Sequence, residues 1–160
     1  MIRVQREPFD VGREIATLTE GNRRIGGVAS FVGLVRDMAG EGDPDHLHAL
    51  TLEHYPGMTE RQLEAIEEEA CRRWPLEACL IVHRYGRLER GDGIVLVVTA
   101  SAHRQAAFES CAFLMDWLKT KAPFWKCEET GRGERWVEAR DSDDLAAARW
   151  SPGDARRAAE

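Results

Sequence analysis

The sequence has no run of about 18 apolar residues, which is what a membrane-spanning helix requires. Its N-terminal segment, MIRVQREPFD, lacks the hydrophobic stretch of a signal peptide. We therefore expect no membrane span and a cytoplasmic location.

Cysteine is scarce and is not spaced for metal binding. The four cysteines form no CxxC pair and match no zinc pattern; they are Cys71, Cys79, Cys111 and Cys127. We interpret them as reduced, mostly buried thiols, with a single disulfide as the alternative. His54 and His83 stand in predicted strands without metal spacing, so we interpret them as structural. We expect no metal site and no cofactor.

Positive charge is also in deficit. There are 22 basic and 28 acidic residues, for a net charge of −6, and this balance argues against a broad nucleic-acid-binding surface. GxGxxG, P-loop and internal repeat patterns are absent as well. A local basic pocket is still compatible with this composition.

The chain of 160 residues, with 43% hydrophobic and 31% charged residues, suits one globular domain. We place this domain at residues 1–150 and a frayed tail at 151–160. Its pattern predicts an α+β fold, with three main helices on a mixed or antiparallel sheet. The helices begin near Asp10, at Thr59 with Gln62 in a capping box, and at Ser101. Strands are expected at 24–35, 48–55, 78–85 and 94–99, the last one central, with a hairpin at 124–129 and 134–140.

The helix expected at 101–121 is apolar over most of its circumference. On a helical wheel Ala107, Cys111, Leu114 and Leu118 form one arc, and aromatic residues extend it on both sides. One small sheet does not easily cover such a helix, so we expect a second copy of the chain to pack against it.

Cationic side chains stand at both ends of this apolar helix. His103 and Arg104 lie in its first turn, where free backbone N–H groups favour an anion. Lys119 and Lys121 lie in its last turn, and Lys126 follows Pro123. This pattern indicates a pocket for a phosphorylated or carboxylated small molecule. Snorkelling lysines and an arginine paired with a glutamate are the structural alternative.

Lys119 is the better candidate for a base or nucleophile, because its wheel position beside Met115 predicts a half-buried amine. Arg104 and Lys119 are separated by roughly 22 Å along the helix axis. One small ligand does not easily contact both ends of one helix. We therefore predict a homodimer in which His103 and Arg104 complete the site of the neighbouring subunit.

Five segments together resemble the large, catalytic subunit of molybdopterin synthase. They are SFVGLVRD (30–37), LTLEHYPGMTE (50–60), SAHR (101–104), LKTKAPFWKCE (118–128) and RWVEARD (135–141). The similarity runs from about Phe9 to Trp150, so the tail after it is not covered. The loop 38–46 also lies outside the match.

The resemblance implies an α/β-hammerhead fold and a homodimeric core, with a small ubiquitin-like sulfur-carrier subunit at each end of a heterotetramer. The carrier's C-terminal Gly-Gly thiocarboxylate would supply sulfur to cyclic pyranopterin monophosphate and form the dithiolene of molybdopterin. Lys119 takes the place of the family's catalytic lysine. The implied substrate-binding residues are Leu34, Val35, Arg36, His103, Arg104, Lys126, Cys127 and Glu128. We add Arg140, at the end of the last predicted strand, as a further candidate anion contact. We interpret Cys127 as a wall residue, with a redox role as the alternative.

A non-catalytic dimeric module that binds a phosphorylated metabolite is the alternative function. The presence of Lys119 and Lys126 favours the enzyme, and a turnover assay separates the two.

Overall fold

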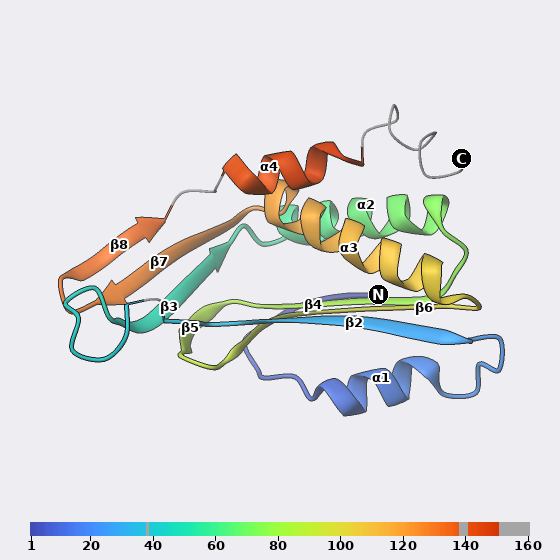
Figure 1. Ribbon diagram of the computed structural model, residues 1–160, viewed down its shortest axis with the longest axis horizontal. Coiled ribbons are helices and arrows are strands. Elements are labelled where there is room, and N and C mark those ends of the chain that lie inside the picture. Colours follow the sequence, from blue (N-terminus) through green and yellow to red (C-terminus); the bar gives the residue numbers. More distant parts are fainter. Residues whose placement is uncertain (38, 138–140, 151–160) are drawn as a thin grey trace.

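The computed structural model describes residues 1–37, 39–137 and 141–150, with the side chains of 141–144 excepted. The predicted α+β fold is confirmed (Figure 1). The expected tail at 151–160 lies outside the described residues. In chain order the elements are β1 (Ile2–Gln5), α1 (Val11–Thr19), β2 (Gly27–Leu34), β3 (Leu47–His54), α2 (Met58–Arg73), β4 (Leu76–Arg84), β5 (Gly86–Glu89), β6 (Gly93–Ser101), α3 (Arg104–Lys121), β7 (Phe124–Thr130), β8 (Gly133–Val137) and α4 (Asp141–Ala148).

The strands divide into two four-stranded sheets. The first has the order β1-β4-β6-β2 and is mixed, because β1 runs parallel to β4 while the other pairs are antiparallel. The apolar strand β6 lies between β4 and β2, as predicted. The second sheet has the order β5-β3-β7-β8 and is antiparallel. It extends beyond one end of the first sheet (Figure 1).

Helices cover both faces of the first sheet. Helices α2 and α3 pack on one face, where Phe113, Leu114 and Leu63 join Ile81 and Val97 in the main core. Helix α1 covers the opposite face, and its apolar side chains contact a second cluster on β4 and β6. A third cluster, smaller than the main core, lies under the second sheet and consists of Val35, Leu47, Leu50, Leu52 and Leu88. The apolar arc predicted for α3 is buried, as expected. Phe108, which was predicted to extend this arc, is instead exposed.

The helix starts agree with the sequence only in part. Asp10 caps α1 as predicted, since its carboxylate accepts a hydrogen bond from the Arg13 N–H. The predicted box of Thr59 with Gln62 is wrong. Helix α2 begins after Gly57, whose φ of 79° suits glycine, and the Glu60 carboxylate accepts from the Gly57 N–H at 2.6 Å.

The predicted start of α3 at Ser101 is also wrong. Strand β6 continues through Ser101, which pairs with Gly27 on one side and Leu76 on the other. The Ser101 hydroxyl donates to the Pro75 carbonyl at 2.8 Å instead of capping the helix. Helix α3 begins at Arg104, and His103 is its N-cap.

Leu63→Ala should lower the free energy of unfolding by about 2–5 kcal/mol, because the Leu63 side chain is 0% exposed in the main core. Leu145→Ala on α4 is the matched control. Leu145 is 76% exposed, so its truncation should change stability by less than about 0.5 kcal/mol. Urea unfolding followed by circular dichroism measures both, and equal losses would contradict this core assignment.

Candidate active site

A cavity of about 1010 Å³ lies where the two sheets meet the C-terminal half of α3. Its walls come from the end of β2, from α3, and from β7 and β8. Six of the predicted site residues line it, namely Leu34, Val35, Arg36, Lys119, Lys126 and Glu128. Segments far apart in the sequence therefore contribute to one site.

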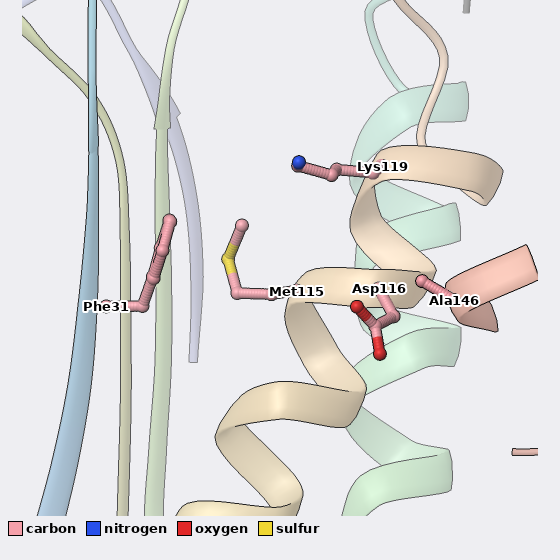
Figure 2. A pocket seen from close by; sticks show the side chains of 5 residues that line it. All are labelled: Phe31, Met115, Asp116, Lys119 and Ala146. Atoms are coloured by element: carbon pink, nitrogen blue, oxygen red, sulfur yellow. The ribbon is translucent and has the colours of Figure 1, made fainter. Parts of the chain in front are cut away.

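Lys119 lies on the last turn of α3 and faces the first sheet. Figure 2 shows its side chain and that of Met115 directed toward Phe31 on β2, with Asp116 and Ala146 of α4 nearby. These five residues line a smaller recess of about 220 Å³. The predicted half-burial of Lys119 is wrong for the single chain, because the side chain is exposed.

Strand β7 presents alternate residues to the cavity. Lys126 and Glu128 line it, whereas Cys127 between them does not. Cys127 is only 6% exposed, and its removal from water, helped by nearby carboxylates such as Glu134, raises the pKa of its thiol. A raised pKa disfavours the reactive thiolate. Cys127 therefore has a packing role next to the cavity, and the four cysteines are all free.

Arg135 on β8 was not predicted as a substrate-binding residue, although it lines the cavity. Hairpin pairing places it opposite Glu128, and its guanidinium donates to the Glu128 carboxylate at 2.7 Å. Only the register of the two strands, and not the local sequence, reveals this position.

Arg36 and Asp37 follow the end of β2. Arg36 is exposed at the cavity wall. The Asp37 carboxylate accepts hydrogen bonds from the N–H groups of Leu47 and Ala39, each at 3.1 Å, and contacts the His46 ring. The Leu47 N–H is the largest influence that lowers the pKa of Asp37. These contacts fix the backbone that carries Arg36.

The structure does not bring His103 and Arg104 to the cavity of their own chain. Both are exposed at the N-terminal end of α3, whereas Lys119 lies near its C-terminal end, roughly 22 Å away along the axis. Arg140, the remaining predicted site residue, lies outside the described part of the chain.

His83 was interpreted from the sequence as structural, yet it lines the cavity. Its ring is 5% exposed at the end of β4 and stacks on Phe124, with 3.6 Å between centroids. Burial, followed by the charges of Lys126 and His54, lowers the pKa of His83 to about 4. The imidazole is therefore neutral at pH 7. No sequence motif indicates that His83 lies on the cavity wall.

The described cavity wall carries a small excess of positive charge, because four cations outnumber the carboxylates of Asp37, Asp45 and Glu128. Cations on several walls are Arg36, Lys119, Lys126 and Arg135. Among the residues described, no group of three His, Cys, Asp or Glu side chains is placed to hold a metal ion. None of the described helices combines the length and hydropathy needed to cross a membrane.

The fold and the cavity define a class: a small α+β protein with a cationic pocket for an anionic substrate. Comparison with known proteins is more specific, because a family model described as MoaE protein matches residues 4–121. The chain belongs to this family.

Close relatives support the assignment. The molybdopterin synthase catalytic subunit of Pseudomonas aeruginosa is 56% identical over 149 residues, which cover 93% of this chain and 97% of that protein. The protein of the same name from Mesorhizobium japonicum is 53% identical over 151 residues, or 93% and 92% of the two chains. The solved structure of molybdopterin cofactor biosynthesis protein E from Burkholderia multivorans has a TM-score of 0.78 at 55% identity and covers 94% of this chain and 95% of that one.

The free energy of unfolding should decrease as the pH is lowered from about 6.5 to about 4. These limits are the ordinary pKa of histidine and the lowered pKa of His83. In this window the unfolded chain binds a proton that the folded chain does not bind, so acid favours unfolding. The contribution is at most about 1.4 kcal/mol per pH unit. Urea unfolding of the wild type and of His83→Phe at stepped pH measures it. An unchanged pH slope in the variant would contradict the lowered pKa.

Proposed function

We propose that this chain is the catalytic subunit of a molybdopterin synthase. It transfers sulfur from the C-terminal thiocarboxylate of a small ubiquitin-like carrier to cyclic pyranopterin monophosphate and forms the dithiolene of molybdopterin. The observation that supports this most directly is the cavity that unites Arg36, Lys119 and Lys126 in a chain of this family.

Both reactants suit the cavity. The pterin carries a phosphate and the carrier ends in a thiocarboxylate, so both are anions that lysine and arginine bind with charge-assisted hydrogen bonds. Pockets for one drug-sized ligand measure roughly 300–1,000 Å³. A cavity of about 1010 Å³ therefore has room for the pterin together with a narrow Gly-Gly tail.

Lys119 is the proposed catalytic residue. The carrier's sulfur bonds to a side-chain carbon of the pterin as a C–O bond of that carbon breaks, and the oxygen leaves as water or as a phosphate oxygen. The product is a thioester. Water then cleaves its acyl C–S bond, so that the carrier leaves as a carboxylate and the sulfur stays on the pterin. The Lys119 ammonium attracts the thiocarboxylate and stabilises the oxyanion that develops when water attacks. Two carriers deliver the two sulfurs.

The proposed site is shared between subunits. The N-terminal end of α3 carries His103 and Arg104 too far from Lys119 for one ligand to contact both in a single chain. In a homodimer, His103 and Arg104 of each chain would contribute to the site of the neighbouring chain. They would supply two more cationic or hydrogen-bonding groups for the phosphate. A carrier at each cavity then makes a heterotetramer. We place the reaction in the cytoplasm, where the free cysteines stay reduced.

Lys119→Ala should lower the rate of dithiolene formation at least about a hundredfold, because it removes the charge opposite the developing oxyanion. The assay mixes the protein with thiocarboxylated carrier and cyclic pyranopterin monophosphate under anaerobic conditions. Lys121→Ala is the matched control, since Lys121 lies over the Trp117 ring outside the cavity. Normal turnover by Lys119→Ala would refute the catalytic assignment. A non-catalytic module would bind the pterin and yield no dithiolene even as wild type.

Mixed dimers test the shared site. A chain with His103→Ala and Arg104→Ala and a chain with Lys119→Ala should each be inactive, whereas the mixture should regain activity after subunit exchange. In such a hybrid, one of the two sites has all its residues intact. Product formation is followed after exchange has been verified with tagged chains. Absence of recovery despite exchange would mean that each site is built from one chain.

A further inference from the structure

His83 is a buried group of the cavity wall that the proposed sulfur transfer does not use. Its ring is held from two directions: it stacks on Phe124 at an interplanar angle of 16°, and Nδ1 lies 2.9 Å from the Arg84 carbonyl oxygen. This leaves the imidazole little freedom to turn away from the cavity.

The hydrogen bond defines which nitrogen carries the proton. A carbonyl oxygen only accepts, so Nδ1 must donate to it. The pKa of about 4 keeps the ring neutral, and Nε2 therefore presents a lone pair. Among the described residues, Nε2 has no protein hydrogen-bond partner.

His83 is the one neutral acceptor among the polar side chains of the described cavity wall. Lysine and arginine only donate. The three carboxylates are already engaged: Asp37 by the Leu47 N–H, Asp45 by Arg132 at 3.1 Å, and Glu128 by Arg135. Nε2 of His83 thus differs from these carboxylates, because it is uncharged and no described donor bonds to it.

A pterin needs such an acceptor. Cations bind its phosphate but do not recognise its ring, whose aminopyrimidinone and reduced pyrazine carry N–H donors. A buried N–H without an acceptor weakens binding. We propose that Nε2 of His83 accepts a hydrogen bond from a ring N–H of the pterin and determines specificity for this heterocycle. This inference rests on the proposed function, because it takes the pterin as the substrate.

Binding is measured apart from turnover, by anaerobic calorimetry of cyclic pyranopterin monophosphate without carrier. His83→Phe keeps the aromatic stack and removes the acceptor, so the dissociation constant should rise about tenfold to a hundredfold. His83→Gln restores an acceptor and should bind within a few-fold of wild type. In turnover assays the KM for the pterin should rise for His83→Phe, with the KM for the carrier unchanged.

Two controls separate recognition of the ring from a general effect on the fold. His54→Phe alters a second histidine near Phe124, with 6.3 Å between the ring centroids. His54 does not line the cavity, so pterin affinity should be unchanged. A simple alkyl phosphate should bind wild type and His83→Phe equally. Methylation of the ring N–H groups should weaken binding to wild type and have little further effect on His83→Phe.

Wild-type affinity in His83→Phe, or equal losses in His83→Phe and His83→Gln, would overturn the proposal. So would a parallel loss of alkyl phosphate binding, and so would a wild-type protein that does not bind the pterin. If the wild type binds the pterin with the expected His83 dependence but forms no dithiolene with carrier, the sulfur-transfer function fails while this inference stands.

Discussion

The site depends on the turn that ends α3. Pro123 has no N–H and cannot continue the helix, so the chain leaves α3 and enters β7 at Phe124. Two contacts hold this turn: the Thr59 hydroxyl donates to the Pro123 carbonyl at 3.3 Å, and the Phe124 ring stacks on His83. As a result, Lys119 before the turn and Lys126 after it lie on different walls of one cavity.

The polar groups of this cavity differ in charge and in hydrogen-bonding capacity. Carboxylates such as Asp37 and Glu128 accept from neighbouring N–H or guanidinium groups and stabilise the loop and hairpin that carry them. Lys119 and Lys126 add positive charge to the cavity wall. Neutral His83 adds an acceptor without adding charge. A ligand with a phosphate at one end and a heterocycle at the other matches this division.

The sequence predicted what depends on neighbours along the chain. The apolar strand β6, the stop at Pro123, and the cations on both sides of it follow from local patterns. Pairing between distant strands was not predictable, so the division into two sheets and the cavity positions of Arg135 and His83 were missed. The predicted cap at Ser101 failed for the same reason: its backbone is committed to β6, between Gly27 and Leu76. Arg140 lies outside the described residues.

The separate small core under the second sheet has a consequence for cooperativity. Its five buried aliphatic residues are far fewer than those of the main core, and small clusters open at lower free energy than large ones. The second sheet can then detach as a local unfolding unit while the first sheet stays folded. Because β7 carries Lys126 and α3 carries Lys119, such partial opening would separate the two lysines. Catalytic competence would then be lost before global denaturation, and hydrogen exchange in β3 and β7 would report that loss.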